Sequence, residues 1–450
     1  MTTLNQQPSD PAWAWARYEP DARRPWNLAL AGHLCRRAAF GATWDQLQRA
    51  LRDGPQRTID GLLRPEADAA AFNRQFDGYE AQSSSSRDVS ELRAWWLQRM
   101  IRTPHPLLEK MTLFWHGHFA ANGAKIESAL LMQQHLQLLR RHALGSFREM
   151  LLGIVHDPAM FLSLDAKASR KAFPNENFPR WLMEAFTLGA GNYADGDVRE
   201  AARAFTGWFV MQDELRLIER EHDTETKRIL GREGRFAAAD VAGILLEQPA
   251  TARMIVRKLY RWLISETAEP DAGLIAPLAE AFAKKDDVLA LVETMLRSNL
   301  FFSAAAYRQR MKCPVEFALG IVKGLEETVP TAPLADAMAR LGQNLLHPPT
   351  AKGWAGGRNW INHATLAGRH NLTAALLKSD GAFGSKLNPA AVAGRHARPG
   401  SDGGARFFRD LFLQGDAESG DIPAGGEWDV DTSARRAAYA VLTLPEFQLA

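Results

Sequence analysis

The residues best suited to chemistry begin with Phe114-Trp-His116-Gly-His118-Phe119, which holds two histidines one residue apart. In a β-strand such a pair is a common ligand set for a divalent metal, because both rings point to one side. The preceding residues instead repeat with a helical period, and two residues so spaced on a helix are about 200° apart. We therefore expect His116 and His118 to share a metal ion only if the helix breaks at Gly117. The other interpretation is two separate structural histidines, with Glu109 on the face of His116.

A second candidate group lies between Asn177 and Arg203. The Asn177 side chain is suited to cap a helix, and Arg180 and Glu184 are four residues apart, which predicts an ion pair on one helix face. Arg199 and Arg203 follow on the next predicted helix with the same spacing. These side chains could form an anion-binding cleft with a carboxylate base, or a polar network that ties helices together. The sequence favours neither interpretation over the other.

A third group is Glu221-His222-Asp223, with Lys227 close behind. A neighbouring imidazole and carboxylate can exchange protons with a substrate or bind a metal. A run of this kind is also typical of a solvated turn, which is the simpler interpretation.

The fourth group is the glycine-rich stretch that contains Lys352, Trp354, Trp360 and Asn362. Its glycines allow the backbone to approach a ligand closely, and the N–H groups at the next helix start could face an anion. The spacing is not that of a phosphate-binding loop, so nucleotide binding is not supported. The two tryptophans could stack on a sugar ring, although filling the core is the simpler interpretation.

These groups lie on segments that mostly repeat with a helical period. Predicted helices cover 90–100, 107–119, 125–143, 177–189, 197–207, 249–265, 271–284, 286–298, 312–325, 333–342 and 358–378. Only 208–216 and the residues around Ile229 have strand character, which predicts at most a small β-hairpin. Strands and helices do not alternate along the chain, as they would in a protein with a parallel sheet. The predicted fold class is therefore mainly α, with one large multi-helix domain.

The composition of the 450 residues limits the partners. Lys and Arg number 54 against 52 Asp and Glu, so neither nucleic acid nor an anionic membrane is an expected partner. No apolar run approaches the roughly 20 residues that span a bilayer, and the first residues lack the apolar core of a signal peptide. Cys35 and Cys313 are the two cysteines, too few for a disulfide framework. These features predict a cytoplasmic protein.

A series of landmarks runs along the chain in a fixed order. The landmarks are His33–Gly41, Glu109–Phe119, Asn175–Arg180, Asp197–Trp208, His222–Gly231, Cys313–Phe317, Pro348–Trp354, Trp360–Asn362 and Leu444–Gln448. In these segments the chain resembles a bacterial family that is known as domain of unknown function 1800. We expect the family's helical domain at 27–379, after an N-terminal extension at 1–26. A loop or lid rich in Gly, Ala, Arg and Asp should follow at 380–430, and a C-terminal helix and tail at 431–450 should pack back on the domain.

The resemblance implies a helical protein but no activity. Members are often exported, and they are often encoded beside a family that resembles sulfatases and alkaline phosphatases, which implies a sulfatase-like partner protein. This chain departs from the family by lacking an export signal. Where many members read Arg-Glu-Leu-x-Glu-Leu-His, it also carries Trp181 and Phe186 in place of two potential metal ligands. A metal site on that helix would be weakened here, whereas a site for an organic ligand would not.

Three functional hypotheses follow. The first is a polar cleft that binds or processes a polar ligand, either anionic or saccharide-like. Its catalytic candidates are Glu109, His116, Arg180, Glu184, His222 and Asp223, and its ligand-binding candidates are Asn177, Arg203, Lys352, Trp354, Trp360 and Asn362. The second hypothesis is a non-catalytic scaffold or binding protein that pairs with a sulfatase-like partner. The third is a metal-dependent enzyme that holds a divalent ion through His116 and His118.

Overall fold

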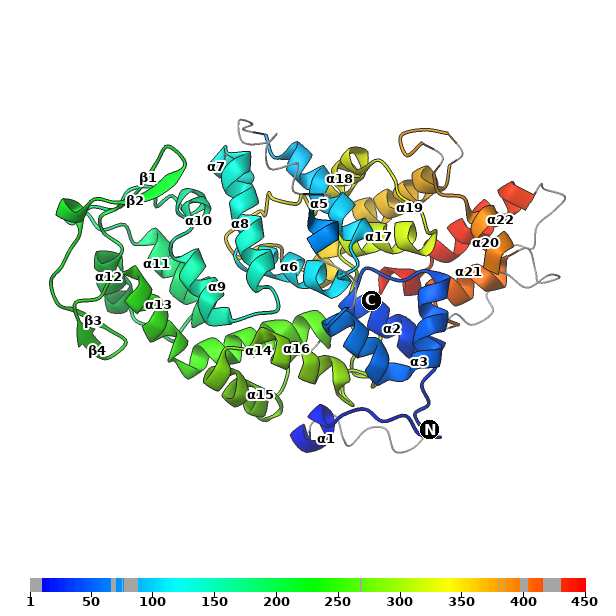
Figure 1. Cartoon of the computed structure of the whole chain (residues 1–450), viewed down its shortest axis with the longest axis horizontal. Coiled ribbons are helices and arrows are strands. Elements are labelled where there is room, and N and C mark those ends of the chain that lie inside the picture. Colours follow the sequence, from blue (N-terminus) through cyan, green and yellow to red (C-terminus); the bar gives the residue numbers. More distant parts are fainter. Residues whose placement is uncertain are drawn as a thin grey trace.

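A computed structural model of the chain describes residues 10–65, 70–74, 76, 88–267, 269–378, 380–384, 386–396, 404–415 and 430–450. The elements are mainly helices that form one continuous body (Figure 1), which confirms the predicted fold class. In the described residues the strands form two small antiparallel pairs, β1 with β2 and β3 with β4. The strand character seen in the sequence thus corresponds to two hairpins.

The first part of the chain contains short and medium helices. They are α1 (Pro11–Trp15), α2 (Leu28–Ala38), α3 (Trp44–Leu63), α5 (Ser90–Arg102), α6 (Pro106–His118), α7 (Gly123–Ile126), α8 (Ala129–His142), α9 (Phe147–Ile154) and α10 (Pro158–Ser163). The uninterrupted helix predicted at 125–143 is wrong, because Glu127 ends α7 in a left-handed conformation with φ 52°. The Ser128 hydroxyl then accepts the N–H of Leu131 at 3.3 Å and starts α8 as its cap.

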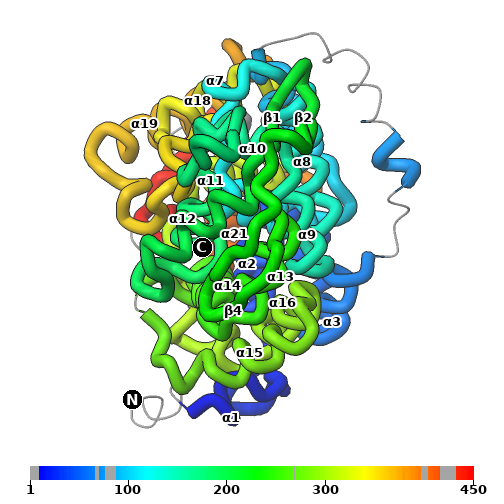
Figure 2. The backbone as a smooth tube through the Cα atoms, turned by 90° about the vertical axis from the view of Figure 1, so that its left-hand side faces the viewer, coloured from blue at the N-terminus to red at the C-terminus, as the bar shows by residue number. Residues whose placement is uncertain are grey.

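The middle part forms the end of the molecule that carries the strands (Figure 1), and Figure 2 looks onto this end. Its elements are α11 (Asn177–Trp181), the π-helix η1 (Leu182–Thr187), α12 (Asp195–Ala204), β1 (Trp208–Met211), β2 (Glu214–Leu217), η2 (Glu219–Glu221), β3 (Lys227–Ile229), β4 (Arg232–Gly234) and α13 (Ala238–Leu246). The helix predicted at 177–189 changes to π geometry at Leu182. The Thr187 hydroxyl donates to the carbonyl of Leu182 at 2.7 Å, five residues back. The wider turn changes which residues share a face.

The last part holds helices at the centre and the opposite end of the molecule (Figure 1). They are α14 (Pro249–Leu263), α15 (Ala272–Lys285), α16 (Val288–Arg297), α17 (Pro314–Gly324), α18 (Thr331–Arg340), η3 (Gly357–Trp360), α19 (His363–Leu377), α20 (Pro389–His396), α21 (Ala405–Phe412), α22 (Val430–Leu442) and η4 (Pro445–Gln448). Two of them, α20 and α21, lie within 380–430, where we expected a loop or lid. Phe408 and Leu411 of α21 are buried and explain why that stretch folds as a helix. Residues 397–403 and 416–429 lie outside the described residues.

The two ends of the described chain pack onto the body. Near the N-terminus, the indole N–H of Trp15 donates to the carbonyl of Leu274 at 2.6 Å. Near the C-terminus, the backbone N–H of Lys312 donates to the carbonyl of Gln448 at 2.8 Å. The buried apolar side chains form one contiguous core. None of the described helices has the length and apolar character needed to cross a bilayer.

Candidate functional site

A cavity of about 200 Å³ lies between α6 and α14. These two helices lie near the middle of the molecule in Figure 1. The segment before α17 and the loop from Lys352 to Trp360 complete its wall. The basic side chains that line it are His118, Lys258, Arg261, Arg310 and Lys352, with one carboxylate, Glu266, and the thiol of Cys313. Three indoles also line it, those of Trp262, Trp354 and Trp360. The cavity is thus both basic and aromatic.

The loop that carries Lys352 and Trp354 is held against α6 by a close contact between two glycines. Gly353 has φ 74°, and a Cβ added there would overlap the carbonyl oxygen of Gly117. Only glycine combines this left-handed backbone with this approach. The Trp354 ring then packs on the His116 ring, with 5.4 Å between the centroids. The loop brings Lys352 and Trp354 to the cavity wall. Both residues are ligand-binding candidates of the sequence analysis.

Lys258 is the cation of the cavity that has no ion-pair partner among the described residues. Its Nζ donates to Nδ1 of His118 at 2.8 Å and to the carbonyl of Ala185 at 3.0 Å, and both acceptors are neutral. Burial, reinforced by the charge of Lys352, lowers the pKa of Lys258 to about 8. An anion that entered the cavity would therefore find an uncompensated positive charge.

The other three cations already have carboxylate partners. Lys352 Nζ lies 2.8 Å from Oε1 of Glu184. Arg261 pairs with Glu269, near the surface. The guanidinium of Arg310 lies 4.4 Å from the centroid of the Trp262 ring and also binds Glu316. These groups can orient a ligand, whereas Lys258 supplies the unbalanced charge.

His116 and His118 do not form a shared metal site, because α6 continues through Gly117 without a break. His116 accepts the N–H of Leu346 on Nε2 at 3.1 Å. His118 uses both ring nitrogens: Nε2 donates to the carbonyl of Phe186 at 3.1 Å, and Nδ1 accepts from Lys258. No group of three His, Cys, Asp or Glu residues suited to a metal occurs in the described part of the chain. The condition that we set for shared ligation, a helix break at Gly117, is therefore not met, and the lone pair on Nδ1 of His118 accepts from Lys258.

Glu109 belongs to a buried ion-pair network away from the cavity wall. Its carboxylate accepts from Nε of Arg99 at 2.6 Å, from Nε of Arg140 at 2.9 Å and from the indole of Trp96 at 2.9 Å. Burial alone would raise the pKa of Glu109, but Arg140 and Arg99 hold it below its ordinary value. The network ties α5, α6 and α8 together.

The ion pair predicted between Arg180 and Glu184 is absent from the described structure. Arg180 instead binds Glu176 and Asp195, both at 2.9 Å. The reason is the π turn at Leu182, which alters the spacing on which the prediction relied. Glu184 faces the cavity loop through Lys352, and this hydrogen bond lowers its pKa.

Asn177 and Asn362 both lie at helix starts. Asn177 is the first residue of α11 rather than its cap, and its N–H donates to the side chain of Asn175 at 2.9 Å. Asn362 caps α19, where its side chain accepts the N–H of Thr365 at 2.9 Å. Trp360, a buried neighbour of Asn362, lines the cavity.

Arg203, His222 and Asp223 meet at the strand-bearing end of the molecule. Arg203 donates to both oxygens of Asp223, at 2.8 and 3.3 Å. The His222 ring donates from Nδ1 to the carbonyl of Thr206 at 2.7 Å. Burial would raise the pKa of Asp223, but the hydrogen bonds from Arg203 and the backbone of Glu225 lower it. This arrangement fixes a turn against α12, so the third group lies apart from the cavity.

Comparison with protein families identifies the family of the chain. The model of a family described as proteins of unknown function (DUF1800) matches residues 33–449, almost the whole length. The chain belongs to the DUF1800 family. Searches of curated proteins and of solved structures gave no significant match. Membership of DUF1800, whose function is unknown, assigns no activity to the cavity.

A buried charge network that the sequence did not reveal adjoins the cavity of this DUF1800 protein. Arg310 belongs to both the network and the cavity wall. Glu316, at the start of α17, binds Lys110 and Arg310, and its Oε2 accepts the N–H of Cys313 at 2.9 Å. Burial would raise the pKa of Glu316, but Arg310 and Lys110 hold it far below its ordinary range. In the sequence, the capping-box spacing of Cys313 and Glu316 was the one signal that could have drawn attention to this network.

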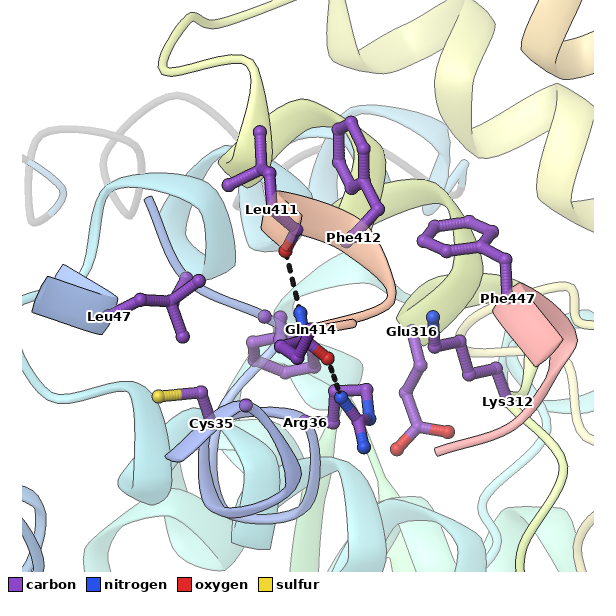
Figure 3. Close-up of a pocket in the computed structure, with 14 residues that line it drawn as sticks. Cys35, Arg36, Leu47, Lys312, Glu316, Leu411, Phe412, Gln414 and Phe447 are labelled. Atoms are coloured by element: carbon purple, nitrogen blue, oxygen red, sulfur yellow. Dashed lines mark hydrogen bonds between the residues drawn. The ribbon is translucent and has the colours of Figure 1, made fainter. Parts of the chain in front are cut away.

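Glu316 also lines a second cavity, of about 30 Å³ (Figure 3). Gln414, after α21, points into it between Arg36 and Leu411. Its Nε2 donates to the carbonyl of Leu411 at 2.6 Å, and its Oε1 accepts from Arg36. A volume of this size holds about one water molecule, so this cavity is part of the packing.

The buried histidines of the DUF1800 chain predict acid sensitivity. Burial lowers the pKa of His116 to about 3, whereas an unfolded chain protonates this ring near pH 6.5. The stability it contributes is therefore complete above about pH 6.5 and is lost as the pH falls toward about 3. We expect the free energy of unfolding to decrease by up to about 1.4 kcal/mol per pH unit from this ring.

Urea unfolding at about pH 7 and about pH 5.5 measures this slope. His116→Asn should reduce the slope, and the same change at the exposed His363 should not. Equal slopes in the wild type and His116→Asn would contradict the expectation.

Proposed function

We propose that the protein binds a small organic anion in the cavity between α6 and α14. The observation that carries the proposal is Lys258, a desolvated cation without a carboxylate partner in the described residues, at the wall of a cavity. A buried charge of this kind is costly unless a ligand or solvent compensates it. The anion of a ligand is the natural complement.

The aromatic side chains of the cavity support a ligand with an organic body. Trp262, Trp354 and Trp360 offer flat apolar surfaces, which suit a sugar ring or another compact carbon skeleton. The indole Nε1 of Trp262 is buried and has no hydrogen-bond partner among the residues that the structure describes. It could donate to a ligand oxygen that enters the cavity.

The proposal is tested by isothermal titration with glucuronate, pyruvate, inorganic phosphate and the neutral sugar glucose. We expect an organic anion to bind, glucose to bind more weakly, and Lys258→Gln to lower the affinity at least tenfold, since a charged hydrogen bond contributes about 1.5–3 kcal/mol. Lys125→Gln is the matched control, because Lys125 is a surface lysine paired with Asp165. Affinity should be constant below about pH 8 and fall above it, as Lys258 loses its proton. Absence of saturable binding by any of the anions, or equal losses in both variants, would refute the proposal.

A second candidate is a non-catalytic scaffold that pairs with a sulfatase-like protein. The observation that favours it is that Glu109, Arg180, Arg203 and Asp223 lie in hydrogen-bonded networks rather than at the cavity. Such networks hold helices in one arrangement. Analytical ultracentrifugation of the chain mixed with a purified sulfatase-like protein tests this candidate. A complex that forms equally well with Lys258→Gln would favour it, and separate sedimentation would reject it.

A further inference from the structure

Two of the three N–H directions of the Lys258 ammonium group are occupied. They point to Nδ1 of His118 and to the carbonyl of Ala185. No third hydrogen-bond partner of Nζ occurs among the described residues, and the side chain lines the cavity. The nitrogen can thus meet a ligand atom while two fixed acceptors orient it.

The state of His118 is set by its second hydrogen bond. Its Nε2 donates to the carbonyl of Phe186 at 3.1 Å, so the neutral ring carries its proton on Nε2. Nδ1 therefore presents a lone pair to Lys258. This arrangement holds the lysine nitrogen at one place against the wall of α6.

Burial and the charge of Lys352 favour the free amine of Lys258. Arg261, Arg310 and the carboxylate of Glu266 line the same cavity, and the structure describes no ion pair for Lys258. Lys110, which is also buried, contrasts with it because Lys110 binds the carboxylate of Glu316. A lysine that is desolvated beside other cations loses its proton readily and becomes a nucleophile.

We propose that Lys258 forms an imine with the carbonyl group of a small anionic aldehyde or ketone, such as a 2-oxo acid. This inference rests on the proposed anion binding and adds a covalent step to it. The amine lone pair of Nζ attacks the carbonyl carbon, a C–N bond forms, and the carbonyl oxygen takes up protons and leaves as water. In total, one ammonium group and one carbonyl compound give one protonated imine and one water.

The neighbouring cations fit the anionic half of such a substrate. Arg261 and Lys352 are partly exposed and bind carboxylates of the protein at the cavity rim, Glu269 and Glu184. A substrate carboxylate could exchange with these partners while its carbonyl carbon meets Nζ. The charge of Lys352 also favours the loss of the ammonium proton before attack.

The test uses glyoxylate as the anionic aldehyde, with sodium cyanoborohydride to reduce the imine to a stable carboxymethyl-lysine. Peptide mapping by mass spectrometry gives the labelling rate of each lysine. We expect Lys258 to react at least tenfold faster than the surface Lys125, and the preference to disappear with propanal, an uncharged aldehyde. The rate should rise with pH to a plateau above about pH 8.

Two arginine variants separate the inference from the proposed function. Lys258→Arg keeps the charge but removes the nucleophile, so it should still bind the anion and lose the preferred label. Lys284→Arg changes an exposed lysine outside the cavity lining and should retain the label on Lys258. Labelling of Lys258 no faster than Lys125, together with intact anion binding, would overturn the imine and leave the proposed function standing. Loss of both labelling and anion binding in the wild type would overturn both.

Discussion

Glu316→Gln is expected to lower the free energy of unfolding by about 3–5 kcal/mol, because it leaves buried cations without their counter-charge. Lys110 and Arg310 bind the same carboxylate, and all three side chains are at most 3% exposed. The glutamine amide can occupy the same volume but carries no charge. Since whole domains are stable by about 5–15 kcal/mol, this one change should remove a large share of the stability.

Chemical denaturation of the purified variant measures the effect. Glu247→Gln is a matched control, because Glu247 pairs with Arg232 at the surface, where such pairs contribute about 1 kcal/mol or less. A Glu316→Gln variant as stable as this control would show that the network does not support the fold.

Gly353→Ala is expected to cost about 2–5 kcal/mol and to weaken anion binding at least tenfold. A methyl group at this position meets the carbonyl oxygen of Gly117 and must also adopt φ 74°. The loop would move away from α6 and take Lys352 and Trp354 with it. Binding and stability should therefore fall together.

Gly342→Ala separates the two causes. Gly342 also has positive φ, 98°, but a Cβ there meets nothing within 4 Å. We expect it to cost about 1–2 kcal/mol from backbone strain alone and to leave anion binding unchanged. If Gly353→Ala behaves like Gly342→Ala in both measurements, the close approach of the loop to α6 is not what shapes the cavity.

The helices could be predicted because apolar periodicity is a local signal. The interruptions could not: Ser128 caps a new helix within an amphipathic run, and Leu182 begins a π turn without any distinctive residue type. The amphipathic run at α21 was hidden by its glycine-rich surroundings. In each case local side-chain hydrogen bonds or tertiary packing decided between conformations of similar energy.

The candidate site was predicted in part. The glycine-rich loop was singled out for a close approach to a ligand, whereas the close approach in the structure is between Gly353 and Gly117 of α6. Lys352, Trp354 and Trp360 line the cavity. Lys258 was missed because it lies on an ordinary amphipathic helix, where a lysine gives no signal. Its chemistry depends on having no ion-pair partner in the described part of the chain, and Glu316 likewise acquires its role only through Lys110, 206 residues away.

The contacts of residues 446–450 have a consequence for synthesis of the protein. The backbone N–H of Ala450 donates to the carbonyl of Arg310 at 2.7 Å, and Gln448 accepts from Lys312. The residues around Arg310 therefore leave the ribosome long before residues 446–450, which contact them, have been synthesised. Contacts so distant in sequence form slowly. We expect Arg310 to stay open to water in the nascent protein until residues 446–450 have been translated.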